Sequence, residues 1–514
     1  MSLVALPAEA PWRTMVELFE AVADRRTQPA LSASSSAGGT VHLGGEALTD
    51  VVARSAALLV GAGAGPGASV GIHLDNASGL EALVLHWAVQ WSGGVAVPLG
   101  TRLALPEIEY IVGHAGLSLI CSGGDHLGLA RAASDSTHAR VLDVTAGLSE
   151  LIATLAPSDS ADVSEHDVAD ILYTSGTTGR PKGVELTHAN NVAAGIELAR
   201  AMELTEGDVF QSAIPYFTST GVHTNPLACL AAGSHLVLEP EFDQHRTLPV
   251  ADVFRSTVYL GAPSMLTLLL RDADLSHRPA SLRHLVFGGS VMTATMLEWL
   301  AAAFPGCALT NLYGQTEAGP GGTVCKPEHI LAKAGSIGNQ GFGPWTSFAV
   351  HDDEGRRAQP GVLGEIVLRS PAVMRGYHDD AVETATALAG GWLHTGDVGF
   401  VDEDGFLFYA DRRKDLVIRG GMNIASAEVE AVLMTYPGVA DVAVIGVAHD
   451  VLGEDLVAVL VAPDGIDSDD LFAHARTRLA DYKTPRRAVI VDELPRNSMG
   501  KVLKRQLRDQ LGQE

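Results

Sequence analysis

Small polar residues and one lysine form the segment of this sequence that is best suited to hold a phosphate group. The segment, YTSGTTGRPKGVELTH, runs from Tyr173 to His188. Gly176, Gly179 and Gly183 let the backbone approach a ligand closely, and successive backbone N–H groups in such turns form an anion-binding nest. The Ser and Thr hydroxyls between them add hydrogen-bond donors, and Lys182 adds a positive charge. These residue types in this order predict a phosphate-binding loop.

The loop is not a P-loop, and its local charge matters because the whole chain is acidic. Lys182 follows Pro181, whereas the pattern GxxxxGK[ST] places glycine before the lysine. The formal net charge is -26, which argues against nucleic acid or an anionic membrane as a partner. A phosphate compound must therefore be attracted by local basic side chains, backbone N–H groups or a bound cation. The alternative interpretation is a Gly-rich surface loop that binds nothing.

The elements that must position this loop are predicted by alternating helical and strand-like patterns. Helical spacing covers 49–60 and 83–91, and apolar strand-like runs cover 69–74 and 95–97. This alternation predicts an α/β fold with substantially parallel sheets. The loop follows a further expected strand, Ala169 to Leu172. Ligands of α/β proteins bind at the carboxyl ends of such strands.

The length of 514 residues predicts two or more domains. Turn signals and short β-rich runs over about 335–410 predict an all-β subregion with hairpins. A complete small α+β unit follows, and we place the boundary at Arg413-Lys414. The expected domains are therefore 1–413, which includes the β-rich subregion, and 414–514.

Composition and termini indicate an intracellular protein. The four cysteines are widely spaced without a CxxC pair, and the 19 histidines show no HExxH or similar metal spacing. The amino-terminal stretch lacks the features of a signal peptide. The apolar stretch from Ala82 to Leu99 contains His86, Gln90 and a glycine pair, which favours a core helix and strand over a membrane span. We expect a cytoplasmic protein without a membrane span.

Several motifs, in order, resemble the acyl-adenylate-forming superfamily, which includes acyl-CoA synthetases, firefly luciferase and peptide-synthetase adenylation domains. The first segment matches [YF]TSGTTGxPKGV without a gap. NLYGQTE, GWLHTGD, DRRKDLVIRGGMNI and LPRNSMGK follow, and the resemblance extends from about Trp12 to Arg508. It implies a large N-terminal domain of parallel-rich sheets with helices and a β-barrel-like subdomain, and a small mobile α+β C-terminal domain.

The resemblance implies ATP, Mg²⁺ and coenzyme A as cosubstrates and cofactor. A carboxylate would attack the α-phosphorus of ATP, a transfer that needs charge neutralisation and alignment. Glu317 would bind Mg²⁺, a hard cation that prefers oxygen ligands, and Lys501 would bridge carboxylate and α-phosphate oxygens. Thr178 joins Lys501 and Glu317 as a catalytic residue. The implied nucleotide site comprises Thr174, Ser175, Gly176, Thr177, Thr178, Gly179, Lys182, Gly288, Gly289, Ser290, Asn311, Tyr313, Gly314, Thr316, Asp397 and Arg412.

In the second half-reaction coenzyme A would attack the acyl-adenylate after the small domain rotates. Lys414 matches the hinge position of the superfamily. Gly420 and Gly421 would then approach the pantetheine arm in place of Lys501. The resemblance leaves a homodimer open, since members of this superfamily often dimerise.

Departures from the superfamily pattern fall near the acyl and nucleotide sites. Acyl ligases commonly show PLFHxxG, whereas this chain has PYFTSTG, so Thr218 replaces an aromatic residue or histidine. We expect a smaller or differently polar pocket. His223 nearby is expected to be a plain helix-surface histidine, and the alternative is that it compensates for the missing residue. Ser426 stands where proline is usual, and Gly288 opens GGSV where GGAPL is usual. The acyl pocket is expected to contain Phe217, Thr218, Gly221 and Gln315.

Competing functions differ in what they need from the sequence. An amino-acid adenylation domain places an aspartate in FDxS, and Phe217-Thr218-Ser219 lacks that counter-charge for a buried ammonium. A hydrolase reading of the GxSxG match at Ser69 fails because Ser69 begins a strand. A non-catalytic sensor would not need Lys182 and Lys501 together. We expect a carboxylate–CoA ligase acting on a small-molecule carboxylic acid; thioesterification of a preformed adenylate, or acyl transfer to a carrier protein, remain alternatives.

Overall fold

The structure, a computed structural model, divides into two compact units. It describes residues 4–23, 29–34, 39–174, 180–290, 292–420, 422–463, 465–496 and 502–511. The first unit contains residues 1–349 and 367–395, and the second contains 350–366 and 396–514. The expected division at residue 413 concerns a hinge, which a single conformation does not test, so it stays a prediction.

A seven-stranded sheet of the first unit carries the predicted phosphate loop. Its strand order is β19-β8-β7-β4-β3-β5-β6; the path from β7 to β6 is parallel throughout, whereas β8 is antiparallel to both β7 and β19. The expected strands at 69–74 and 95–97 are observed as β3 and β4. The strands are β3 (Ser69–His73), β4 (Val95–Pro98), β5 (Leu119–Ser122), β6 (Arg140–Asp143), β7 (Val168–Thr174), β8 (Lys182–Thr187) and β19 (Gly376–Tyr377).

A nine-stranded sheet is the second large sheet of the first unit. Its order is β16-β14-β13-β12-β11-β9-β10-β1-β2, and the path from β13 to β1 is parallel throughout. The strands are β1 (Pro29–Ser34), β2 (Thr40–Gly44), β9 (Val209–Ser212), β10 (His235–Leu238), β11 (Val258–Gly261), β12 (His284–Gly288), β13 (Ala308–Gly314), β14 (Gly322–Cys325) and β16 (Gln340–Gly341). The predicted α/β class with parallel-rich sheets is confirmed.

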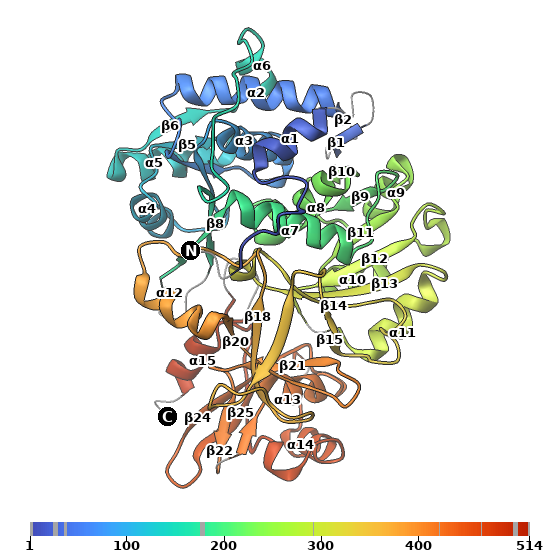
Figure 1. The fold of residues 1–514 in the computed structure, drawn as a ribbon. Helices are drawn as coiled ribbons and strands as arrows, with labels where there is room; N and C mark the ends of the chain where they lie inside the picture. Colours follow the sequence, from blue (N-terminus) through green and yellow to red (C-terminus); the bar gives the residue numbers. More distant parts are fainter. Residues whose placement is uncertain are drawn as a thin grey trace. The chain divides into compact units, whose positions relative to one another are not determined.

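Helices pack on these sheets and bury the main core (Figure 1). The helix α3 is buried on nearly every side, because most of its residues are apolar, and His86 and Gln90 are buried polar exceptions. In the described residues, no helix is both long and apolar enough to cross a membrane. The helices of this unit are α1 (Met15–Ala23), α2 (Gly45–Gly61), α3 (Gly79–Trp91), α4 (Leu105–His114), α5 (Leu127–Thr137), α6 (Leu148–Ile152), α7 (His188–Ala201), α8 (Asn225–Ala232), α9 (Thr247–Phe254), α10 (Pro263–Asp272), α11 (Ala294–Ala303) and α12 (Ala381–Ala387).

The β-rich subregion is not all-β, so that expectation is wrong. Five strands form a sheet in the order β15-β21-β20-β18-β17. The helix α12 interrupts the region, because Asp380 accepts a hydrogen bond from Glu383 N–H and caps a short run with helical propensity. The short strands β16 and β19 pair with the larger sheets. The five strands are β15 (Ser336–Gly338), β17 (Ser347–His351), β18 (Gly364–Arg369), β20 (Leu393–Val401) and β21 (Leu407–Arg412).

The C-terminal part of the second unit is a small α+β structure with its own cores. The strands β24 and β25 form a long antiparallel pair, and β26 joins β25 in parallel. Apolar residues form continuous buried runs on β24 and β25, so both faces of this pair are covered. The elements are β22 (Val417–Arg419), β23 (Met422–Ile424), β24 (Asp441–His449), β25 (Gly453–Val461), β26 (Arg487–Ile490), α13 (Ser426–Leu433), α14 (Ser468–Arg476) and α15 (Lys504–Leu511).

Candidate nucleotide and acyl site

The predicted phosphate loop connects two antiparallel strands. Thr174, the last residue of β7, pairs with Lys182, the first residue of β8. The strand β7 is longer than the expected run from 169 to 172, because Tyr173 and Thr174 continue the pairing. A strand–loop–strand connection also separates this loop from the strand–loop–helix P-loop. The predicted residues Ser175, Gly176, Thr177, Thr178 and Gly179 lie outside the described residues.

Tyr377 brings Lys182 and Glu317 together in the first unit. The Lys182 ammonium lies 5.0 Å from the centroid of the Tyr377 ring. The Tyr377 hydroxyl donates a hydrogen bond of 3.0 Å to Glu317 Oε1. Lys182 also forms an ion pair with Glu383 on α12. A cation suited to phosphate and a carboxylate oxygen suited to Mg²⁺ are therefore held by one side chain.

A cavity of about 200 Å³ lies beside Lys182. Arg180 and Lys182 contribute positive charge to its lining, and His114 and His378 contribute imidazole rings. His114 Nδ1 lies 2.7 Å from the Tyr173 hydroxyl. Burial, together with the neighbouring His378, lowers the pKa of His114. The cavity therefore keeps its positive charge chiefly on the two long basic side chains.

The ends of β12 and β13 form the predicted wall for adenine. Gly288 allows a close backbone approach, since a Cβ there would lie 2.3 Å from the Leu312 carbonyl oxygen. Gly289 has a φ of +81° and turns the chain away at this point. The predicted nucleotide residues in these two strand ends are half-buried or exposed, apart from buried Asn311. They are Gly288, Gly289, Ser290, Asn311, Tyr313 and Gly314, with Thr316 in the short helix η5 (Thr316–Ala318).

Asn311 has a structural role that the sequence did not indicate. Its Nδ2 donates a hydrogen bond of 3.0 Å to the carbonyl oxygen of Ser336. Because its side chain is buried and faces β15, its predicted contact with the nucleotide stays a prediction without direct geometric support.

The second unit holds the predicted ribose-binding pair. Asp397 on β20 and Arg412 on β21 are cross-strand neighbours, and Arg412 Nε lies 2.7 Å from Asp397 Oδ1. The Asp397 side chain is 3% exposed. Lys414, the predicted hinge, is exposed, and Gly420 adopts a φ of +59°. The predicted residues Gly421 and Lys501 lie outside the described residues.

The predicted acyl segment has an internal scaffold centred on Thr218. The Thr218 hydroxyl donates to the Pro215 carbonyl oxygen at 2.7 Å and accepts from Gly221 N–H at 3.0 Å. A Cβ at Gly221 would lie 2.0 Å from the same carbonyl oxygen. Thr218 thus has a structural use for its hydroxyl, and Gly221 is required by the tight fold of the segment. Phe217 is half-buried against the main core.

Gln315 and His223 are the remaining residues that the sequence singled out for the acyl region. Gln315, predicted in the acyl pocket, is half-buried, and its Nε2 has no hydrogen-bond partner within the described ranges. His223 was expected on a helix surface, and this expectation is wrong. Its side chain is 0% exposed and lies 3.1 Å from Asp170. A buried carboxylate supplies the partner that makes burial of this imidazole favourable.

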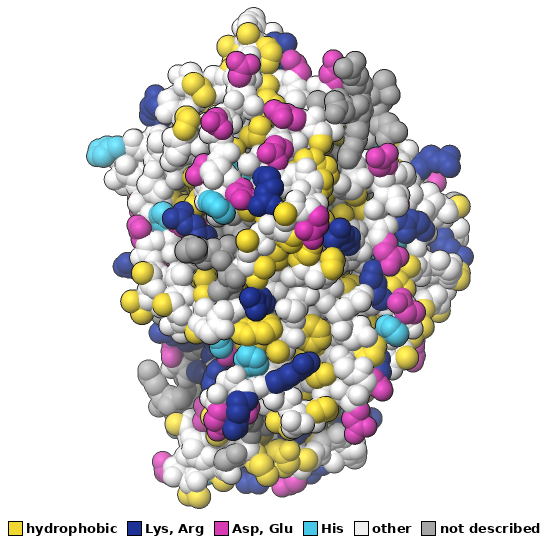
Figure 2. Space-filling model, in the orientation of Figure 1, with side chains coloured by type: hydrophobic (Ala, Val, Ile, Leu, Met, Phe, Trp, Pro, Cys, Tyr) yellow, Lys and Arg dark blue, Asp and Glu magenta, His cyan; other side chains and the backbone are white. Residues whose placement is uncertain are grey.

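The first unit contains the local positive charge that this acidic protein would need to attract a phosphate compound. On the face shown in Figure 2, acidic and basic side chains are interspersed. Arg180 and Lys182 line a single cavity, and the carboxylates of Glu317 and Glu383 contact Tyr377 and Lys182 respectively. Asp380 also lines this cavity, so an anion would be attracted locally by Arg180 and Lys182 in competition with the neighbouring carboxylates.

The chain matches the models of a known enzyme family. The family model described as AMP-binding enzyme matches residues 18–378, and the model described as AMP-binding enzyme C-terminal domain matches residues 428–501. The chain therefore belongs to the AMP-binding enzyme family. The resemblance drawn from the motifs is confirmed.

Similar proteins place the chain with the CoA ligases of this family. A 3-[(3aS,4S,7aS)-7a-methyl-1,5-dioxo-octahydro-1H-inden-4-yl]propanoyl:CoA ligase of Mycobacterium tuberculosis is 36% identical over 90% of this chain and 92% of its own length. A feruloyl-CoA synthase of Amycolatopsis is 37% identical over 92% of this chain and 96% of its own length. The crystal structure of ATP-bound MatB from Rhodopseudomonas palustris has a TM-score of 0.87 at 30% identity, covering 97% of this chain and 99% of that one. The expected class, an acyl-CoA ligase, is confirmed by these relatives.

Proposed function

We propose that this protein is an ATP-dependent ligase that joins a small-molecule carboxylic acid to coenzyme A through an acyl-adenylate. The observation that carries the proposal is the pairing of Lys182 and Glu317 through Tyr377. One side chain thus fixes a cation for phosphate beside a carboxylate for Mg²⁺. Asp397 beside Arg412 adds an acceptor for ribose hydroxyls in the second unit.

In the first half-reaction a carboxylate oxygen of the acid attacks the α-phosphorus of ATP, and pyrophosphate leaves. Lys182 would hold the β- and γ-phosphates as they depart, and Tyr377 keeps its ammonium in place. Mg²⁺, held by Glu317, would supply charge neutralisation on the phosphate oxygens. Lys501 would place its ammonium between the carboxylate and the α-phosphate, where negative charge develops.

In the second half-reaction the thiol of coenzyme A attacks the acyl carbonyl, its proton is lost, and AMP leaves with the bridging oxygen. We propose that rotation about Lys414 withdraws Lys501 and brings Gly420 and Gly421 to the site. The acid has no ammonium to pair, because Thr218 stands where an aspartate would be needed and uses its hydroxyl inside its own segment. We also propose that the reaction takes place in the cytoplasm and involves no nucleic acid.

A screen of carboxylic acids by mass spectrometry tests this function. Mixtures of acids are incubated with the protein, ATP, Mg²⁺ and coenzyme A, and each component is omitted in turn. Ring-bearing acids belong at the head of the panel, since the two curated relatives are named for such acids. Thioester that forms only in the complete mixture, with AMP in equal amount, is the expected result.

Two other results would decide against the full reaction. In the first, no free acid is active, but a synthetic acyl-adenylate and coenzyme A give thioester. The protein would then catalyse only the second half-reaction. In the second, product forms on a carrier-protein thiol and none forms on coenzyme A. The acyl acceptor would then be a carrier protein. A Lys501→Ala variant separates the steps further, because it should suppress acid-dependent ATP–pyrophosphate exchange while it spares thioester formation from supplied adenylate.

A further inference from the structure

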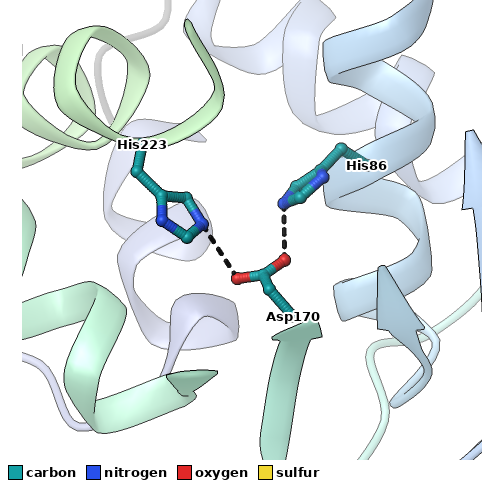
Figure 3. A group of neighbouring side chains, drawn as sticks. All are labelled: His86, Asp170 and His223. Atoms are coloured by element: carbon teal, nitrogen blue, oxygen red, sulfur yellow. Dashed lines mark hydrogen bonds and ion pairs between the residues drawn. The ribbon is translucent and has the colours of Figure 1, made fainter. Parts of the chain in front are cut away.

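Asp170 is a buried carboxylate inside the strand that leads into the phosphate loop. Its side chain is 0% exposed, and its neighbours in β7 are apolar. His86 Nε2 lies 2.7 Å from Asp170 Oδ1, and His223 Nε2 lies 3.1 Å from Asp170 Oδ2, as Figure 3 shows. A carboxylate in such a position is costly unless it is fully hydrogen-bonded. Asp170 therefore needs an explanation that packing alone does not give.

Two amides complete the set of donors around Asp170. Gln90 Nε2 donates to Asp170 Oδ1 at 2.9 Å, and Asn191 Nδ2 donates to Asp170 Oδ2. Burial opposes ionisation of Asp170, but the charge of His86 and hydrogen bonds from both imidazoles overcome it and hold the pKa of Asp170 far below its ordinary range. The group is therefore an anion that accepts two hydrogen bonds on each oxygen.

The proton positions follow from this acceptor. Each imidazole must carry its proton on Nε2, because Asp170 can only accept. His86 Nδ1 then lies 3.2 Å from the Tyr216 hydroxyl, which can serve it as donor or acceptor. His223 Nδ1 faces away from Asp170 (Figure 3) and has no partner among the side chains that the structure describes.

The same three residues could in principle hold a metal ion, since their ligand atoms lie within 4.8 Å of one another. Two imidazoles and one carboxylate are a common metal-binding set. However, the distances of 2.7 and 3.1 Å from the two Nε2 atoms to the Asp170 oxygens are those of direct hydrogen bonds. Both oxygens also accept amide protons already. The geometry is that of a hydrogen-bonded anchor.

This anchor holds the predicted acyl segment from both of its ends. Tyr216 comes directly before Phe217, and it reaches Asp170 through His86. His223 belongs to the π-helix η3 (Thr220–Thr224), which follows directly, and it contacts Asp170 itself. A π-helix is rare and is frequent at functional sites. Asp170 lies four residues before Thr174, where the phosphate loop begins.

We propose that Asp170, His86 and His223 form a positioning network that sets the acyl segment against the strand of the phosphate loop, and so determines how tightly the acid binds. The network does not touch the substrate. The inference rests on the proposed function, because it takes the segment around Phe217 as the wall of the acyl pocket. Its specific consequence is that losing the network weakens binding of the acid and spares binding of ATP.

Kinetics and hydrogen exchange of Asp170→Asn test the proposal. The variant replaces an acceptor oxygen by an amide that meets an Nε2–H donor, so at least one charged hydrogen bond is lost. We expect KM for the acid to rise by about tenfold or more, and KM for ATP to change by less than about threefold. Backbone exchange in peptides from 215–224 should become faster, while peptides from β11 and β12 keep wild-type rates.

A matched control and milder variants distinguish loss of the network from general unfolding. Glu197→Gln removes another buried carboxylate of the first unit, one that accepts hydrogen bonds from Trp345 N–H and Thr346. It should leave the acid and ATP constants unchanged. If Asp170→Asn does not fold, Tyr216→Phe and His223→Leu each remove one link, and His223→Gln restores a donor at the second position and should recover part of the lost affinity.

The outcomes separate failure of this inference from failure of the proposed function. Wild-type exchange rates at 215–224 in every variant, or equal losses for acid and ATP, overturn the positioning role. One metal ion per wild-type chain, lost in Asp170→Asn, also overturns it in favour of a metal site. If no acid is active with the wild type, the proposed function fails, and exchange at 215–224 alone then decides whether the network anchors the segment.

Discussion

Lys182 is paired with a carboxylate of its own chain, so ATP must compete for it. Its ammonium forms an ion pair with Glu383 on α12. If the same ammonium binds the β- and γ-phosphates, this pair must open or be shared when ATP arrives. Glu383→Gln removes the competing charge and keeps the size of the side chain. ATP should therefore bind the variant more tightly than it binds the wild type.

The expected size of the effect follows from exposure. The Lys182 side chain is 15% exposed and that of Glu383 is 42% exposed, so the pair is screened by solvent. Such pairs contribute about 0.2–1 kcal/mol, which corresponds to a fall of about 1.4- to 5-fold in Kd for ATP. Calorimetric titration with MgATP in the absence of acid measures this constant directly. Lys182→Ala should move Kd in the opposite direction.

The control is Glu298→Gln, because Glu298 is exposed on α11 and the variant makes the same change of charge. It should leave Kd for ATP at the wild-type value. Unchanged or weaker ATP binding in Glu383→Gln would refute the competition between Glu383 and ATP. Weaker binding in particular would mean that Glu383 orients Lys182 for the phosphates.

Two further predictions concern stability. Ser426→Pro removes two of the donors to buried Asp411, the Ser426 N–H at 2.6 Å and the Ser426 hydroxyl; urea denaturation should show a loss of about 1–3 kcal/mol, and an equally stable variant would contradict the role of these bonds. Burial lowers the pKa of His73, His235 and His284 to about 4, so the unfolded chain binds more protons between about pH 6.5 and pH 4. Stability should be full above this window and fall as the pH drops through it; a flat melting temperature across it would contradict the neutral, buried histidines.

The sequence predicted the elements whose signal is local. The apolar runs at β3 and β4 and the helical spacing of α2 were found because each pattern repeats within a few residues. The all-β expectation for the region before the hinge failed at α12. This helix is short and depends on the Asp380 cap, and turn signals on either side made the stretch resemble another loop.

The site was predictable where its residues fall in continuous motifs and not where the fold brings distant ones together. Lys182 and Glu317 stood in recognisable strings, but Glu383 lies 201 residues from Lys182. The network around Asp170 joins a helix, a strand and a π-helix, and no spacing in the sequence relates them. Its one available signal was a charged residue inside the apolar run VADIL, since a buried carboxylate requires partners.

The most direct test of the acyl-adenylate route follows the oxygen atoms of the acid. An active acid from the screen is prepared with isotopically labelled carboxylate oxygens and converted completely with ATP and coenzyme A. Because the attacking oxygen stays on phosphorus when the thiol displaces AMP, each AMP should carry one labelled oxygen, and pyrophosphate should carry none. Unlabelled AMP, or label in pyrophosphate, would contradict attack of the carboxylate on the α-phosphorus.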